Sequence, residues 1–383
     1  MVSEVPFRPW RKPSPVRSLQ CSGYPPMPRV TPLQSTTLRD EIPLSQSRRL
    51  LLGEALGRGN VATVYRGLLE SEGRVKRPVA VKLFEAVASD ERENVFPRLE
   101  RLARHAAYVQ HPNVVETYEF GILGTSQPYL ITQIVEGMSL TSLLESYART
   151  RKRVPLDLAL FIGLEVAEAL VGTRRATAPD GRRVGFAHGD LSTREVLLSW
   201  HGEVKVSDFG VARAVGAASA VRRIAMLAKR VATVAPEVAQ GQKDDPRSDV
   251  FSLGVLLHEM VIGPRFPAGM PDADKLKCAR TGYVHTSAFG PQLPDRLRDV
   301  LLRSIAIDPD VRYADAGMVA YDLRRIAMEM GVGDGRVFLR NALQNLMDDT
   351  ENDGYETEES EQADGRHDAS DEHPVSVRPA NDG

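Results

Sequence analysis

The pattern of apolar and polar positions divides the chain into a β-rich part and a helical part. Between residues 50 and 83, short apolar runs are separated by glycines and turn residues, which is typical of strands. Residues 89–108 change to helical spacing, with one apolar face made of Val95, Leu99, Leu102 and Ala106. We expect further strands at 114–121 and 129–135 and helices at 140–149, 156–175, 247–262, 294–305 and 315–330. The two parts meet near residues 133–137, and a cleft between such halves is a natural ligand site.

Charge is distributed unevenly along the 383 residues, although the formal net charge is only −2. Residues 1–48 are rich in proline, serine and arginine and carry 7 basic and 3 acidic side chains. Residues 348–383 carry 2 basic and 13 acidic side chains and few apolar ones. Neither flank can bury enough apolar surface to offset its ordering entropy, so we expect a disordered arm and a disordered acidic tail. Either flank is a candidate docking segment for a partner.

Several protein classes are excluded by composition. No apolar run reaches the ~18 residues of a membrane helix, so we expect no membrane partner. The two cysteines, Cys21 and Cys278, lie far apart and form no disulfide framework or CxxC metal site. Together with the lack of an apolar export signal, they favour a cytoplasmic protein. Neither flank is basic enough to indicate nucleic-acid binding.

Short motifs in a particular order carry the candidate chemistry. Each has an ordinary structural explanation when taken alone, such as a hairpin turn or a surface lysine at a strand end. In chain order they are Gly57-Arg58-Gly59, Val79-Ala80-Val81-Lys82, His188-Gly189-Asp190-Leu191, Asp208-Phe209-Gly210, Ala235-Pro236-Glu237, Asp249 and Arg312. Asp208 follows Asp190 by eighteen residues, and the glycine turn precedes the strand lysine. The order and spacing are far more specific than any single motif.

This ordered set resembles the eukaryotic-like protein kinase family, in particular bacterial serine/threonine protein kinases. The resemblance covers about residues 50–330. It implies an α+β, bilobal protein-kinase fold with a small β-rich N-lobe and a larger α-helical C-lobe. The expected divisions are the arm at 1–48, the N-lobe at 49–134, the C-lobe at 135–330, an appended helix at 331–347 and the tail at 348–383.

The resemblance also implies a role for each matching position. ATP is expected to bind at Leu56, Gly57, Gly59, Val64, Ala80, Lys82, Gln133, Val135 and Leu197. Asp190 would receive or orient the proton of the attacking hydroxyl, and Asp208 and Glu195 would hold Mg²⁺, with Mn²⁺ as the alternative metal. Glu100 is the expected partner of Lys82, with Glu93 as a second choice. The structural alternative for Glu100 is a surface pair with Arg104. Glu237, Arg312 and Asp249 are expected to be scaffold.

The catalytic loop departs from the family at three positions. Gly189 stands where an arginine is usual, Ser192 where a lysine is usual and Glu195 where an asparagine is usual. Glu195 can bind a metal through oxygen, but it adds a negative charge that faces ATP and Asp208. Before Ala235, residues 229–234 lack the family's usual Gly-Thr pair.

Three functions fit these observations. The first is an ATP-dependent kinase that phosphorylates serine or threonine hydroxyls of a protein substrate. The second is a pseudokinase that binds ATP or acts as a scaffold, because of Glu195 and Ser192. The third is a small-molecule phosphotransferase. The His188-Gly189-Asp190 loop, which resembles that of aminoglycoside phosphotransferases, favours it. The Asp208-Phe-Gly and Ala235-Pro-Glu motifs oppose it. Transfer to a protein or to a small molecule separates the first from the third.

Overall fold

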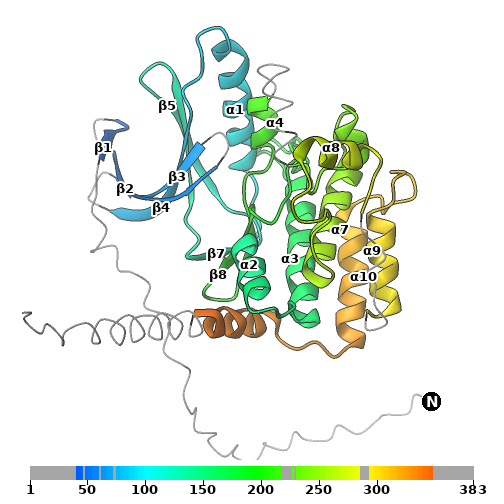
Figure 1. Cartoon of the computed structure of the whole chain (residues 1–383). Coiled ribbons are helices and arrows are strands. Elements are labelled where there is room, and N and C mark those ends of the chain that lie inside the picture. Colours follow the sequence, from blue (N-terminus) through cyan, green and yellow to red (C-terminus); the bar gives the residue numbers. More distant parts are fainter. Residues whose placement is uncertain are drawn as a thin grey trace, which may run out of the picture.

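A sheet-based lobe and a helical lobe face each other in the computed structural model of the chain (Figure 1). The structure describes residues 40–45, 48–59, 62–71, 75–216, 227, 230–284 and 293–347. The predicted arm up to residue 39 and the predicted tail from residue 348 lie outside the described residues. The arrangement confirms the expected bilobal α+β fold.

The smaller lobe is built on an antiparallel six-stranded sheet. Its strands are β1 (Asp40–Pro43), β2 (Arg49–Arg58), β3 (Ala62–Glu70), β4 (Lys76–Phe84), β5 (Thr117–Leu123) and β6 (Gln127–Gln133). They are ordered β1-β2-β3-β4-β6-β5. Side chains at every second position, among them Val79 and Val81 of β4 and Ile131 of β6, are buried together. The alternation of apolar and polar residues in the sequence therefore corresponds to one buried face of this sheet.

Strand β1 lies inside the segment that we expected to be disordered. Its residues pair with β2 in the register Glu41 with Leu51 and Ile42 with Leu50. Arg49 then forms ion pairs across the sheet with Glu41 at 3.0 Å and Glu70 at 3.1 Å. The expected boundary at residue 48 is therefore too late. A four-residue edge strand is too short to show a hydrophobic periodicity of its own. Its strand conformation depends on pairing with the neighbouring strand.

Helices form most of the larger lobe. They are α2 (Leu140–Arg149), α3 (Leu156–Arg174), α6 (Pro236–Ala239), α7 (Pro246–Val261), α8 (Asp272–Arg280), α9 (Asp295–Ser304) and α10 (Ala316–Glu329). Helix α3 is buried on most sides, because α7 and α10 pack against it. A small sheet of β7 (Gly137–Ser139), β8 (Val196–Ser199) and β9 (Val204–Val206) lies toward the other lobe. None of the helices within the described residues has the length and apolar character that would let it cross a membrane.

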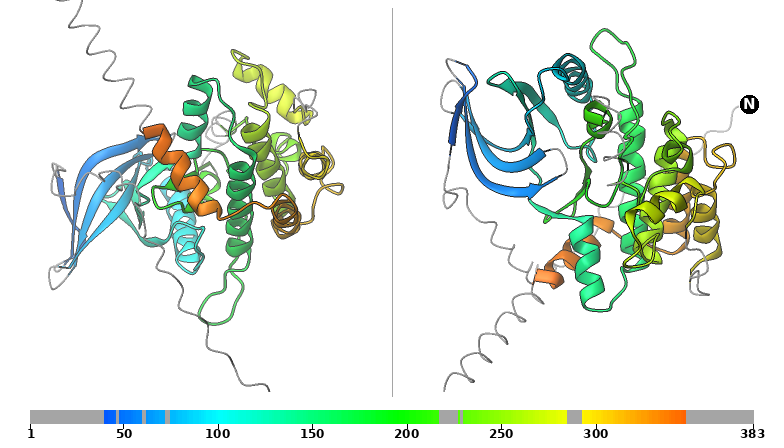
Figure 2. Two further views of the ribbon diagram at one scale, coloured as in Figure 1. Left: turned by 90° about the horizontal axis from the view of Figure 1, so that it is seen from below. Right: turned by 45° about the horizontal axis from the view of Figure 1, so that its top comes forward.

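Two helices lie side by side next to the sheet, α1 (Arg92–Ala106) and the short α4 (Val211–Gly216) (Figure 1). Seen from below, a further helix over residues 335–347 crosses under the junction of the lobes (Figure 2). Its Leu339 and Leu343 are buried in the main core of the helical lobe. Gly335 lies so close to the Phe161 ring that a Cβ there would sit 2.1 Å from it. This helix is therefore an integral part of the lobe's packing.

A buried ion pair connects the start of α6 to the loop before α10. Both guanidinium Nη atoms of Arg312 donate to the Glu237 carboxylate, each at 2.8 Å, and the Ser248 hydroxyl donates to it at 2.7 Å. Burial opposes ionisation of Glu237, but these hydrogen bonds outweigh it and hold the pKa of the carboxyl below its usual value. Arg312 also donates to the carbonyls of Ala306 and Ile307. The pair is fully hydrogen-bonded, which is the condition for a buried pair to be stable.

Arg312→Ala is expected to lower the free energy of unfolding by ~3–5 kcal/mol, because Glu237 is left buried without its partner. The matched control is Arg324→Ala, which removes the partly exposed pair with Glu168 and is expected to cost ~1 kcal/mol or less. Urea unfolding of both variants measures the difference. Equal losses would contradict the structural role of the Arg312 pair.

Candidate active site

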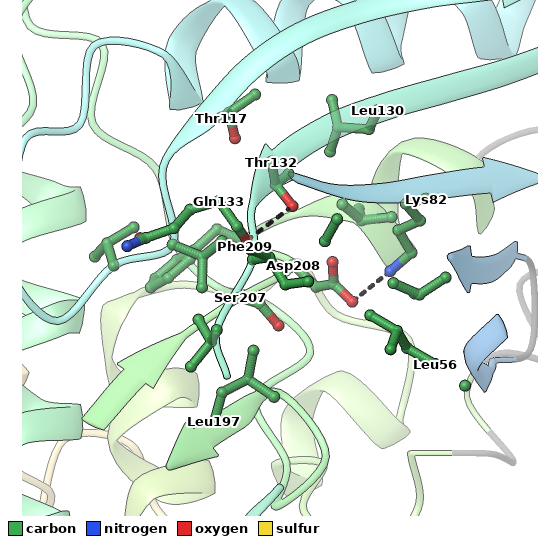
Figure 3. Close-up of a pocket in the computed structure, with 18 of the residues that line it drawn as sticks. Leu56, Lys82, Thr117, Leu130, Thr132, Gln133, Leu197, Ser207, Asp208 and Phe209 are labelled. Atoms are coloured by element: carbon green, nitrogen blue, oxygen red, sulfur yellow. Dashed lines mark hydrogen bonds and ion pairs between the residues drawn. The ribbon is translucent and has the colours of Figure 1, made fainter. Parts of the chain in front are cut away.

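A cavity of about 730 Å³ opens between the two lobes. Figure 3 shows Leu56 and Lys82 on its N-lobe side and Leu197 and Asp208 on the opposite side. Eight of the predicted ATP-binding residues line it, namely Leu56, Gly57, Val64, Ala80, Lys82, Gln133, Val135 and Leu197. The side chain of Arg66 binds both oxygens of Glu136, at 2.5 and 2.7 Å, and ties β3 to the segment between the lobes.

Gly59 is the ninth predicted ATP-binding residue, and it lies at the turn rather than in the cavity wall. Its N–H donates to the carbonyl of Ala62 at 2.8 Å and closes the β2–β3 turn. A Cβ at this position would lie 3.3 Å from that carbonyl oxygen, a tight contact. Glycine at 59 therefore allows the close turn, and its contact with ATP remains a prediction.

Lys82 and Asp208 form an ion pair across the cavity (Figure 3). Lys82 is on β4 of the small lobe, and Asp208 follows β9 in the large lobe. Asp208 has a φ of +63°, a left-handed conformation that is uncommon for a residue other than glycine. Such backbone strain occurs where the surroundings hold a side chain in a required direction. Here the direction is toward Lys82.

Packing of the neighbouring Phe209 ring fixes the position of Asp208. The ring is buried, lies 4.4 Å from the His188 ring and meets Phe186 edge-on at 6.3 Å between centroids. Gly210, directly after it, donates its N–H to the His188 carbonyl at 2.8 Å. The segment that carries Asp208 is therefore packed onto the segment that carries Asp190.

The Asp249 carboxylate anchors the backbone of the catalytic loop. It accepts the backbone N–H of His188 at 2.8 Å and that of Gly189 at 2.9 Å. The Asp190 N–H points at Nδ1 of His188 at 3.2 Å, so Nδ1 accepts and Nε2–H donates to the Ser207 carbonyl at 3.0 Å. Burial lowers the pKa of His188 to about 4, so this ring is neutral near pH 7. A neutral, doubly hydrogen-bonded histidine keeps the loop in one shape.

Gly189 adopts a φ of +72°, and a Cβ there would lie 2.6 Å from an Asp244 carboxylate oxygen. A side chain such as the family's arginine would be strained in this backbone conformation. The departure from the family at this position thus has a local structural reason.

Asp190, Glu195 and Asp208 place three carboxylates close enough to affect one another. Burial, followed by the charges of Glu195 and Asp208, raises the pKa of Asp190 to about 7, while Arg230 and Lys82 oppose the rise. Burial also raises the pKa of Glu195, although the Ser192 hydroxyl donates to its carboxylate and counteracts this. Negative charge is therefore in excess around Asp190.

A divalent metal fits this excess of negative charge. Hard carboxylate oxygens are the ligands that Mg²⁺ prefers, and Mg²⁺ usually takes one or two of them plus substrate phosphates. The described residues contain no group of three His, Cys, Asp or Glu side chains that could hold a metal by themselves. Asp208 and Glu195 together match the two-carboxylate kind of site.

Comparison with known proteins agrees with this geometry. The family model described as "Protein tyrosine and serine/threonine kinase" matches residues 50–319. A probable serine/threonine-protein kinase of Streptomyces coelicolor is 33% identical over 289 residues, which are 74% of this chain and 40% of that protein. The serine/threonine-protein kinase PknL of Mycobacterium tuberculosis is 32% identical over 292 residues, 76% of this chain and 68% of that protein. PknB of Mycobacterium leprae is 30% identical over 285 residues, 73% of this chain and 43% of that protein.

The chain belongs to the protein kinase family. The matched part spans less than half the length of two of these three relatives. The helix over residues 335–347 lies beyond the residues that the kinase family model matches. Its last residue, Met347, nevertheless lines the cavity together with Trp200, a contribution that the motifs gave no reason to expect.

The kinase partner that we expected for Lys82 is not in place. Glu100 is exposed (57% of its side chain) and forms an ion pair with Arg104 at 2.7 Å, and Glu93 is also exposed. Leu99 and Ala103 of α1 face inward instead, and α4 packs against them through Val211 and Val215. The expected Lys82–Glu100 contact is thus absent, and Asp208 takes its place. The apolar spacing that predicted α1 already put Leu99, rather than Glu100, on the inner face.

A pair of neighbouring substitutions tests which face of α1 points inward. Leu99→Ala is expected to cost ~2–5 kcal/mol of stability, because a buried side chain is removed. Glu100→Ala is expected to cost only ~0.5 kcal/mol or less, because it removes a surface pair. Denaturant unfolding of the two variants gives the comparison. A larger loss for Glu100→Ala than for Leu99→Ala would show that Glu100 faces the interior.

Proposed function

We propose that this chain is an ATP-dependent serine/threonine protein kinase that transfers the γ-phosphate of ATP to hydroxyls of a protein substrate. The observation that carries the proposal is the ion pair of Lys82 and Asp208 in the cavity, with Asp190 close enough for both charges to affect its pKa. The relatives are named as serine/threonine-protein kinases, which supports the same choice.

The residues divide the work according to their chemistry. Phosphoryl transfer requires little covalent chemistry from the protein and depends on positioning and charge stabilisation. Lys82 would bind the phosphates of ATP, and the apolar walls at Val64, Ala80 and Leu197 would enclose the adenine. Asp190 would accept a hydrogen bond from the substrate hydroxyl and receive its proton. The roles of Lys82 and of the apolar walls rest on their position in the cavity and on resemblance to the family, and the role of Asp190 rests on the resemblance.

Asp208 and Glu195 would hold Mg²⁺ or Mn²⁺, which supplies positive charge against the phosphate oxygens when bound. Lys82 would then leave Asp208 for the phosphates, because both cations compete for the same carboxylate. We also propose the cytoplasm as the site of action, on the basis of the two separated cysteines. The protein substrate and any role for the flanks remain open to experiment.

Transfer of labelled γ-phosphate to the chain itself and to a generic basic protein tests the proposal, with Mg²⁺ and with Mn²⁺. Asp190→Ala is expected to reduce transfer by ~100-fold or more, because the hydroxyl loses its proton acceptor. The matched control is Asp180→Ala, which removes an exposed aspartate that pairs with Arg182 at 3.7 Å. Label is expected on serine or threonine.

Other outcomes separate the alternatives. No transfer by the unaltered chain with either metal, although ATP still raises its melting temperature, would make it a pseudokinase. Recovery of transfer only in Glu195→Asn would identify that glutamate as the reason. Label on an aminoglycoside, with none on protein, would indicate a small-molecule phosphotransferase.

The pH dependence of kcat/KM provides a second prediction. Asp190 must be ionised to accept a proton, and its pKa is raised to about 7. The rate is therefore expected to fall as pH decreases through about 7, because protonated Asp190 is inactive. Glu195→Gln removes a charge that raises this pKa, so the acid limb should shift to lower pH.

Glu145→Gln, on the exposed surface of α2, is the control for Glu195→Gln. Titration of ATP itself is common to all variants and cancels in the comparison. An acid limb that stays in place in Glu195→Gln would contradict the charge coupling between Glu195 and Asp190.

A further inference from the structure

Arg230 places a guanidinium group against the catalytic loop. Its Nη1 donates to the carbonyl of Gly189 and lies 3.9 Å from Oδ1 of Asp190. Only 19% of the Arg230 side chain is exposed. Its Nε is buried and has no hydrogen-bond partner among the described residues. Arg230 is therefore a partly buried cation that forms an ion pair with the proposed proton acceptor.

The backbone of Arg230 is anchored to the rigid part of the helical lobe. Its carbonyl accepts the N–H of Thr233 at 3.1 Å and that of Val234 at 3.2 Å. Val231 and Val234 are buried in the cluster around Phe251. Arg265 donates to the carbonyls of Ala232 and Val234 at 3.3 and 2.9 Å. Because its backbone is held in this way, the Arg230 side chain is suited to a permanent contact with Asp190. It is less suited to block the site and then move away.

The catalytic loop lacks the lysine that is usual in serine/threonine kinases. Ser192 stands at the position of the usual lysine, and its hydroxyl is engaged with the Glu195 carboxylate. Glu195 in turn adds a negative charge where an asparagine is usual. The loop has thus lost one positive charge and gained one negative charge close to Asp190. Arg230, in the segment that lacks the family's usual Gly-Thr pair, brings one positive charge back to the same place.

We propose that Arg230 is a positioning residue that takes over the role of the lysine missing at position 192, by orienting the Asp190 carboxylate and offsetting the neighbouring negative charges. The inference rests on the proposed kinase function and deepens it. Arg230 acts through Asp190: the Nη1–Gly189 hydrogen bond fixes the guanidinium, and the 3.9 Å ion pair fixes the side chain of Asp190 relative to the loop. The positive charge that is lost with the serine at 192 is then supplied by the arginine at 230.

The decisive experiment is a double-mutant cycle between positions 230 and 192 in the full chain, with γ-phosphate transfer as the readout. Arg230→Thr is expected to reduce kcat by about tenfold or more and to leave KM for ATP within about threefold, since Arg230 contacts Asp190 and not the nucleotide walls. Arg230→Lys keeps the charge and should retain most of kcat. Ser192→Lys should raise the rate of Arg230→Thr at least about fivefold, and should raise the rate of the chain that keeps Arg230 by a smaller factor.

The pH profile gives a readout that a purely structural residue would not move. Asp190 faces Glu195, Asp208, Lys82 and Arg230, and the two acids oppose the two cations. Removal of Arg230 should shift the acid limb of kcat/KM to higher pH, and Ser192→Lys should shift it back. The control is Arg149→Gln, which removes an exposed arginine at the end of α2 and should leave the acid limb of the profile in place.

The outcomes are distinguishable. No transfer by the unaltered chain would overturn the kinase function and this inference with it. Transfer by the unaltered chain that is equal or faster in folded Arg230→Thr would overturn the role of Arg230 alone. If Arg230→Thr does not fold, the remaining variants decide: a gain above about tenfold from Ser192→Lys in the unaltered chain, or loss of most activity in Arg230→Lys, would each contradict a cation already supplied by Arg230.

Discussion

Mutual repulsion among three acids, Asp190, Glu195 and Asp208, is the constraint on which the arrangement of this site depends. Burial and the neighbouring charges raise the pKa of both Asp190 and Glu195, so the fold must bring cations to them. Lys82 arrives from the sheet of the small lobe, and Arg230 from the segment before α6. Because Lys82 and Asp208 come from different lobes, their ion pair also joins the two halves of the molecule across the cavity.

Hydrogen bonds and ring packing around the catalytic loop supply the rigidity that these charges require. The Asp249 carboxylate holds two backbone N–H groups of the catalytic loop, and the uncharged His188 ring joins this loop to Ser207. Phe209 packs on His188 and keeps Asp208 in its left-handed backbone conformation. Charged residues can be held at fixed distances here because hydrogen bonds anchor the backbone that carries them and the adjoining apolar groups are buried.

The departures from the kinase pattern form connected groups in space. Gly189 permits a backbone turn beside Asp244 that a larger residue would strain. The Ser192 hydroxyl is hydrogen-bonded to the Glu195 carboxylate, and Arg230, from outside the loop, forms an ion pair with Asp190. In helix α1 the expected contact is also replaced by others. Leu99 packs against α4, and Glu100 pairs with Arg104 at the surface instead of with Lys82. Each unusual residue is therefore best understood with its neighbour in the fold.

The sequence by itself determined the bilobal fold class, most long helices, the larger strands and the family, because hydrophobic periodicity and ordered motifs are local properties of the chain. It also predicted eight residues that line the cavity. Short elements such as β1 and α4 could not be predicted, since their order comes from the strand or helix beside them. Only the tertiary structure decided that Lys82 pairs with Asp208 instead of Glu100, and that Arg230 lies at Asp190. Those contacts join segments from 40 to 126 residues apart, and the distance between such side chains is set by packing, not by sequence spacing.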